Sequence, residues 1–230
     1  MKASYTLPRT LLACVLITAV APVLASGGGP VSMPQMDMQR SQSPQDRARD
    51  SYNDGVRAVR KADKYAEQAL EGNNQGKQDR AARDAQEAYA KALGKFQQAV
   101  QNDPQMHEAW NYVGYTNRKL RNYDAALAAY DRALALRPGY PEALEYRGEA
   151  YLALNRVSDA EQSYLDLFAG NRVLADKLLA AMKGWLDAQR TAGAADANTI
   201  SELDKWIQER AQIAGQTASL TREGTASSWR

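Results

Sequence analysis

The sequence predicts an all-α chain built from helical hairpins that stack in series. Three observations support this prediction: stretches with apolar residues at helical spacing, Gly, Asn and Pro residues between those stretches, and a sequence period of 34 residues. The chain has 230 residues, of which 44% are hydrophobic and 24% charged, a composition typical of a globular protein. The predicted elements are taken below in chain order.

Residues 1–25 are predicted to be a cleaved secretory signal peptide. Lys2 and Arg9 form its positive start, residues 10–24 are almost uncharged and apolar, and small residues precede the expected cut after Ala25. The apolar run is too short for a comfortable bilayer span, so an uncleaved membrane anchor is the less favoured alternative. The expected location of the protein is therefore the periplasm or the outside of the cell.

The single cysteine, Cys14, lies inside this segment. The residues from Leu11 to Cys14 resemble a bacterial lipoprotein box, but Arg9 stands just before them and the apolar run follows them, which disfavours lipidation. After cleavage the chain has no cysteine, which excludes disulfides, a thiol nucleophile and a cysteine metal site.

The formal net charge of +2 comes from 29 basic and 27 acidic residues. Lys2 and Arg9 account for this excess, so the chain after residue 25 is neutral. Together with export, this disfavours a nucleic-acid partner.

Residues 26–49 are rich in Gly, Pro, Ser, Gln and Met and lack an apolar period, so they are predicted to form a disordered linker. This linker contains Met33, Met36 and Met38. Thioethers suit Cu(I), so copper handling through this cluster is an alternative function. A low-complexity linker that happens to contain Met is the favoured interpretation.

Two long helices are expected next, over residues 52–71 and 79–101. The first has one apolar stripe and ends at Gly72-Asn73-Asn74, residue types that tolerate a left-handed backbone after a last turn. The second ends before Asn102-Asp103-Pro104. The apolar stripe of the first consists of Tyr52, Val56, Val59, Ala62, Ala66 and Leu70.

The period of 34 is clearest between residues 107 and 172. A shift of 34 aligns Tyr112 with Tyr146, Gly114 with Gly148, Ala126 with Ala160 and Tyr130 with Tyr164, and a backward shift aligns Pro138 with Pro104. These residue types suit two antiparallel helices in each repeat. The small residues Gly114 and Ala126 allow a close approach, the large residues Trp110 and Tyr130 fill the space beside it, and Pro138 ends the second helix.

These positions resemble the tetratricopeptide repeat family. The resemblance rests on Trp110, Gly114, Ala126, Tyr130 and Pro138 in residues 107–140, and on Gly148, Ala160 and Tyr164 in residues 141–172. Asn117 departs from the family, which usually has Tyr there, and Tyr151 restores it in the next repeat.

The resemblance implies a solenoid of about three repeats within a helical domain of residues 50–214. The helix at 52–71 does not fit the period, so an elongated first hairpin is expected. Two amphipathic helices, over 173–190 and 197–213, are expected to cap the solenoid. Residues 215–230 are predicted to be a flexible tail.

The search for catalytic or metal chemistry yields little. His107 is the only histidine and begins a predicted helix, where a surface role is the favoured interpretation. The sequence has neither a Gly-x-Ser-x-Gly elbow nor a phosphate-binding Gly-rich loop followed by Lys. We therefore expect no enzymatic activity, no cofactor and no metal site.

A basic stripe of Arg57, Arg60, Lys61 and Lys64 lies on the first long helix. Asp54, Asp63, Glu67 and Glu71 lie on or beside it, so a salt-bridged, solvated face is the favoured interpretation over an anion-binding one.

In the tetratricopeptide repeat family the first helix of each repeat lines the concave surface, where partners often bind as peptides. The resemblance therefore implies a partner-binding groove formed by Asn111, Tyr115, Arg118, Glu145, Glu149 and Leu152. Together with Glu142, the two glutamates make this wall acidic, which argues against an acidic ligand. The alternative is that these residues only solvate the groove, or that the C-terminal helices fill it.

The expected function is that of an exported, non-catalytic scaffold or adaptor that binds a protein or peptide partner in the cell envelope. No integral membrane segment is expected after signal cleavage. Besides copper handling, a structural role through self-association into a homo-oligomer is a further alternative, because the end of a solenoid can stack on itself.

Overall fold

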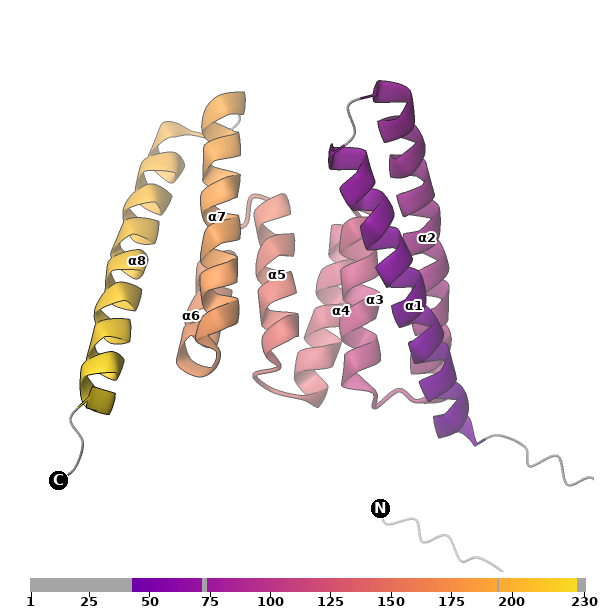
Figure 1. Cartoon of the computed structure of the whole chain (residues 1–230). Coiled ribbons are helices and arrows are strands. Elements are labelled where there is room, and N and C mark those ends of the chain that lie inside the picture. The colour runs from indigo at the N-terminus through magenta and orange to yellow at the C-terminus, as the bar shows by residue number, and fades with distance from the viewer. Residues whose placement is uncertain (1–42, 72–73, 194, 227–230) are drawn as a thin grey trace, which may run out of the picture. The chain divides into compact units, whose positions relative to one another are not determined.

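A computed structural model of the chain describes residues 43–71, 74–193 and 195–226, with side chains described up to residue 216. Every regular element in these residues is a helix, which confirms the all-α prediction. Eight helices form four consecutive hairpins (Figure 1), and their bounds are α1 Pro44–Glu71, α2 Gln75–Asn102, α3 His107–Lys119, α4 Tyr123–Leu136, α5 Pro141–Ala153, α6 Val157–Gly170, α7 Arg172–Ala192 and α8 Ala197–Ala226.

The first hairpin is elongated, as the sequence predicts, but α1 begins earlier than expected. Ser43 caps it by accepting a hydrogen bond from the Asp46 N–H at 3.1 Å and donating its hydroxyl to the Asp46 carboxylate at 2.7 Å. Residues 44–49, which the sequence analysis placed in the linker, are therefore helical. The segment is mostly polar, and Ala48, which is fully buried, marks its inward face.

A glycine lies against an aromatic ring in the first two hairpins. A Cβ added to Gly55 of α1 would lie 2.6 Å from Cε1 of Phe96 in α2, and one added to Gly114 of α3 would overlap the ring of Tyr130 in α4. Only a residue without a side chain allows the two helices of each hairpin to come this close. Gly148 is in equally tight contact, with Leu178 of α7 as its nearest neighbour at 2.6 Å from the added Cβ.

The two short hairpins turn through the same backbone motif. After α3, the Asn122 N–H donates to the Asn117 carbonyl at 2.9 Å, and after α5 the Arg156 N–H donates to the Tyr151 carbonyl at 2.9 Å. The residue before each donor is left-handed, with φ of 66° at Arg121 and 57° at Asn155. This is the Schellman ending of a helix, in which glycine is the preferred left-handed residue.

The last two helices form a fourth hairpin, with Leu178, Met182 and Leu186 of α7 buried together with Leu203 of α8. Asn171 caps α7 by accepting from the Leu174 N–H at 3.0 Å, and Gly193 ends it with a left-handed φ of 60°. Helix α8 continues to Ala226, so part of the predicted tail is helical.

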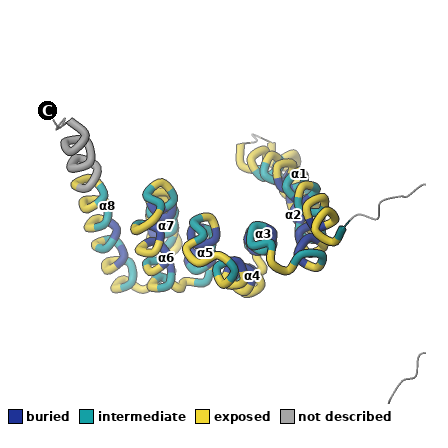
Figure 2. Tube along the Cα trace, turned by 90° about the horizontal axis from the view of Figure 1, so that it is seen from below, coloured by how far each residue is buried: buried dark blue, intermediate teal, exposed yellow. Residues whose placement is uncertain are grey.

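The described residues form one unit, in which each hairpin packs on the next. Viewed along the helices, α3, α5 and α7 lie on the side toward which the row curves, and α4 lies on the outer side (Figure 2). No helix of the described residues is long and apolar enough to cross a membrane. The predicted signal peptide, with Cys14, and the Met33, Met36 and Met38 cluster lie outside the described residues.

The glycine contacts predict opposite effects of two glycine substitutions. Gly114→Ala forces a Cβ into the Tyr130 ring, and we expect it to lower the free energy of unfolding by about 1–3 kcal/mol. Gly94→Ala, in the interior of α2 with no atom near its added Cβ, should raise it by about 0.5–1 kcal/mol through better helix propensity. Urea titration of both variants measures the change in the free energy of unfolding. Equal changes would contradict the close contact of Gly114 with the Tyr130 ring.

The left-handed turn at Arg121 gives a second prediction. Arg121→Gly removes the steric cost of a positive φ at an exposed position, and we expect about 0.5–1 kcal/mol of stabilisation. Asn155→Gly is the matched control and should gain less, because Asn already tolerates this conformation. Thermal unfolding measures both, and a gain at Asn155 that exceeds the gain at Arg121 would refute the argument.

Candidate functional site

The candidate site is the polar surface that the first helix of each hairpin contributes, called here the inner wall. Its members are Asp63 of α1, Tyr115, Arg118 and Lys119 of α3, Glu145, Tyr146 and Glu149 of α5, and Lys177 of α7. These residues form a chain of hydrogen bonds, ion pairs and ring contacts from the first hairpin to the last.

The first link joins three helices at Asp63. Its Oδ1 accepts hydrogen bonds from the hydroxyls of Tyr89 in α2 at 2.5 Å and Tyr115 in α3 at 2.7 Å. Burial and the hydrogen bonds to this carboxylate raise the pKa of both tyrosines above the ordinary value, so both hydroxyls stay protonated donors. The Asp63 carboxylate is thus engaged inside the protein.

The second link joins α3 to α5. Arg118 forms an ion pair with Glu149, and its guanidinium carbon lies 5.5 Å from the centre of the Tyr115 ring and 5.4 Å from that of Tyr146. The two rings are themselves 5.1 Å apart. Arginine favours such sites because a planar guanidinium can stack on rings while it pairs with a carboxylate.

The third link joins α5 to α7. The carboxylate of Glu145 lies 3.1 Å from Nζ of Lys177, whose ammonium is also 5.3 Å from the centre of the Tyr146 ring. Only 1% of Glu145 is exposed, whereas 54% of the Lys177 side chain is. Burial and the neighbouring Glu149 raise the pKa of Glu145 to about 7, against the pull of Lys177.

The sequence-predicted groove residues divide into two sets. Arg118 and Glu149 come together as an ion pair with partly exposed side chains. The other four, Asn111, Tyr115, Glu145 and Leu152, are buried between helices. Their burial means that a partner would reach mainly the rims of these side chains.

Sequence reasoning missed Asp63, Lys119, Tyr146 and Lys177. The 34-residue period signals Tyr146, because it aligns with Tyr112. Asp63 lies in the elongated hairpin and Lys177 in the capping helix, both outside the clear repeats, so no periodic signal marks either. Asp63 had been expected on the solvated basic stripe, but it faces two tyrosines instead.

The wall is less acidic than the sequence suggests. Glu149 is paired with Arg118, and Glu145 with Lys177, so neither glutamate is a free negative charge. Glu142 remains exposed at the start of α5.

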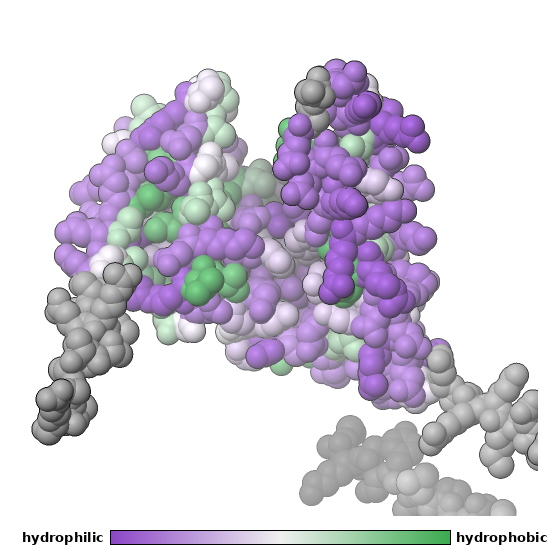
Figure 3. Space-filling view, viewed as in Figure 1, coloured by the Kyte–Doolittle hydropathy of each residue, from purple (hydrophilic) through white to green (hydrophobic). Residues whose placement is uncertain are grey.

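The helices that carry and flank the inner wall differ in length. Helices α3 and α5 have 13 residues each, whereas α1 and α2 have 28 each and α7 has 21. The longer helices extend beyond the shorter ones, and the surface is hollowed between them (Figure 3). Lys119 is the last residue of α3, one of these two short helices.

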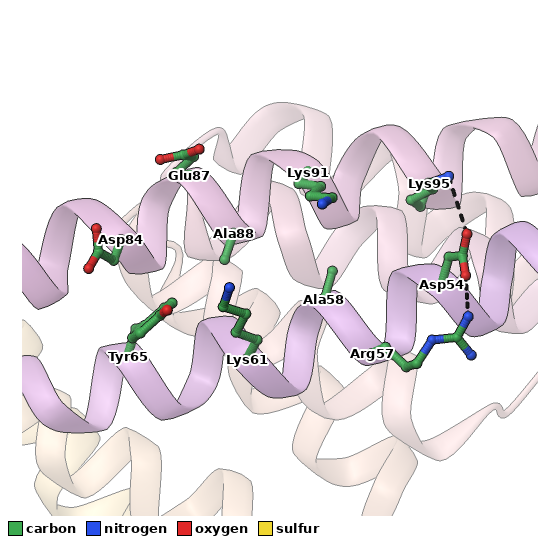
Figure 4. A pocket seen from close by; sticks show the side chains of 10 residues that line it. All are labelled: Asp54, Arg57, Ala58, Lys61, Tyr65, Asp84, Glu87, Ala88, Lys91 and Lys95. Carbon is green, nitrogen blue, oxygen red and sulfur yellow. Dashed lines mark hydrogen bonds and ion pairs between the residues drawn. The ribbon is translucent and has the colours of Figure 1, made fainter.

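A separate groove of about 700 Å³ runs along the α1/α2 hairpin (Figure 4). Ala58 and Ala88 form its base, and Asp54 holds Arg57 in an ion pair and Lys95 in another at 3.2 Å. Arg57 is thus the one residue of the basic stripe that forms an ion pair among the described residues.

A third groove, of about 530 Å³, lies between α7 and α8. Leu179, Leu186 and Ile207 line it, and charged residues such as Asp176 and Arg190 stand around it. Green, hydrophobic surface is visible in this region in Figure 3.

His107 begins α3, as the sequence predicts, and packs against its neighbours. Its ring lies edge-on to that of Tyr140 at 4.9 Å, and its Nδ1 is 3.1 Å from Oε2 of Glu108. Among the described residues, no group of three or more His, Cys, Asp or Glu side chains could hold a metal ion.

Comparison with known proteins gives a matching family model and similarity to solved structures. The family described as tetratricopeptide repeat matches residues 71–141 and, in an overlapping match, residues 114–171. One solved structure, the crystal structure of MamA, is 19% identical to this chain in sequence. The match covers 76% of this chain and 98% of the MamA chain, with a TM-score of 0.41. No curated protein sequence shows significant similarity to the chain.

The buried carboxyl of Glu145 predicts a pH-dependent stability. Its pKa is raised to about 7 in the folded chain from an ordinary value of about 4.3, so the folded chain binds the proton more tightly. The stabilisation is fully present below about pH 4.3 and is lost as pH rises through about 7.

We therefore expect wild type to lose about 1–3 kcal/mol between pH 4 and pH 7 relative to Glu145→Gln. Denaturant titrations across this range measure the difference. Glu142→Gln, an exposed glutamate on the same helix, is the control and should leave the pH profile of the wild type unchanged. Parallel profiles for wild type and Glu145→Gln would contradict the assignment.

Proposed function

Because residues 71–171 belong to the tetratricopeptide repeat family, whose repeats mediate protein–protein interaction, we propose that this chain is an exported, non-catalytic scaffold. In this proposal it binds a protein or peptide partner of the cell envelope through the inner wall. The observation that supports it is a connected charged and aromatic surface to which the first helix of each of the four hairpins contributes.

The chemistry of the wall suits binding rather than reaction. Most of its charged groups are engaged within the wall: Asp63 accepts hydrogen bonds from two tyrosines, Arg118 pairs with Glu149, and Lys177 pairs with Glu145. Such a network holds side chains in fixed positions, which lowers the entropy cost of binding a partner. Tyrosine and arginine are also the residue types most enriched where partners bind tightly.

Export rests on the predicted signal peptide of residues 1–25. Fractionation of the native cells with mass spectrometry of the mature N-terminus tests it. A chain that begins near Ser26 in the periplasm or medium supports export, and a full-length cytoplasmic chain refutes it.

The binding proposal predicts where a partner crosslinks. A photo-crosslinking amino acid at position 177, on the exposed rim of the inner wall, should capture a specific protein in the native cell envelope. The same amino acid at position 91, in the α1/α2 groove, is the matched control and should not capture that protein. Mass spectrometry identifies the adducts.

Two further variants connect that adduct to the wall. Arg118→Ala and Glu149→Ala each break the ion pair that joins α3 to α5, and each should reduce the position-177 adduct several-fold, while circular dichroism shows the same helix content. An adduct that forms only from position 91, or one that these variants do not weaken, would refute the inner wall as the binding surface.

A further inference from the structure

The free charges of the inner wall are mainly positive, although the wall contains as many acidic as basic groups. Asp63 accepts two tyrosine hydroxyls, Glu149 is paired with Arg118, and Glu145 is 1% exposed. Lys119, by contrast, is an exposed residue that forms no ion pair with a described residue. The three acidic groups of the wall are thus engaged or buried, whereas Lys119 is accessible and unpaired among the described residues, and the exposed Glu142 lies outside this set at the start of α5.

Three cations surround a single pair of rings. Nζ of Lys119 lies 5.4 Å from the centre of the Tyr115 ring, Nζ of Lys177 lies 5.3 Å from that of Tyr146, and the guanidinium of Arg118 lies near both rings. Because the rings are 5.1 Å apart, these three positive groups share one small region of the wall.

The neighbouring positive charges affect the pKa of Lys119. Burial and the charge of Arg118 lower the pKa of Lys119, with Lys177 adding to the effect, against the attraction of Asp63 and Glu149. A negative group placed beside Lys119 would relieve this repulsion. The backbone at this end of α3 is already satisfied by the Schellman turn, so its last carbonyls do not require the lysine.

The arrangement favours an extended ligand over a small ion. Lys119 ends α3, Tyr146 lies in α5 and Lys177 lies in α7, so the recognition groups are distributed over the first helices of three successive hairpins. A peptide segment that crosses these helices can pair with both lysines and cover the Tyr146 ring between them.

We propose that the inner wall recognises an acidic peptide segment of its partner, with carboxylate side chains bound at Lys119 and Lys177 and the chain lying across Tyr146. This inference rests on the proposed function and names the chemistry of the partner. It reverses the expectation from sequence, in which Glu142, Glu145 and Glu149 argued against an acidic ligand.

Peptide titration tests the inference. The probe is a fluorescein-labelled peptide of alternating glutamate and alanine, compared with one in which glutamine replaces every glutamate and one in which lysine does. Fluorescence anisotropy with the purified chain should show binding of the glutamate peptide that weakens as salt rises. The glutamine and lysine peptides should bind more weakly at every salt concentration.

Single lysine variants then locate the site. Lys119→Gln should weaken the glutamate peptide by about twofold to fivefold, the range of one partly exposed ion pair. Lys91→Gln, an exposed lysine in the α1/α2 groove, is the matched control and should change nothing. Lys177→Gln is a second variant with the same expected direction, and circular dichroism verifies the fold of all three.

The outcomes separate this inference from the proposed function. Equal affinity for the glutamate and glutamine peptides, or unchanged binding in Lys119→Gln, overturns acidic recognition. If the lysine peptide binds best and position 177 still crosslinks a partner, the binding function stands without the acidic preference. If no peptide binds and crosslinking from position 177 also fails, both proposals fall.

Discussion

The close approach of two helices over a glycine is the contact on which this fold depends. Gly55 lies under Phe96 and Gly114 under Tyr130, so each aromatic ring fills the space that a side chain would otherwise occupy. The rings then extend the contact to the next hairpin: Phe96 stacks on Tyr112 at 4.8 Å, and Tyr130 lies 6.4 Å from Tyr146. From α1 to α5, packing within a hairpin and between hairpins therefore forms a continuous series of aromatic contacts.

The sequence predicts most of the fold because the residue types of this contact recur at a fixed spacing, although Gly148 packs on Leu178 of α7 rather than on a ring. In residues 107–172 the glycine and the aromatic residue recur every 34 positions, which identifies both hairpins and their order. In the first hairpin, Gly55 and Phe96 are farther apart in sequence than Gly114 and Tyr130, so the same contact is present but its period is lost. The elongated hairpin could be expected, whereas its central glycine could not.

The candidate site was less predictable because it depends on which side chains meet across different hairpins. The 34-residue alignment places Asn111 and Glu145 at the same repeat position, yet Glu145 meets Lys177 of a helix that has no repeat pattern. Whether a glutamate is free or paired depends on that meeting. The positions of the glutamates alone therefore predicted an acidic wall, whereas Glu145 and Glu149 are each paired with a cation.

The unequal helix lengths have a consequence for the depth of the hollow. A helix grows by about 1.5 Å for each residue, and its side chains return to the same face after about one turn. Lengthening α1 and α2 by matched whole turns beyond Glu71 and Gln75 would raise one rim of the hollow while leaving Gly55 and Phe96 in place. The length of the first hairpin can thus change to suit partners of different thickness. The glycine contacts that hold the hairpins together stay the same.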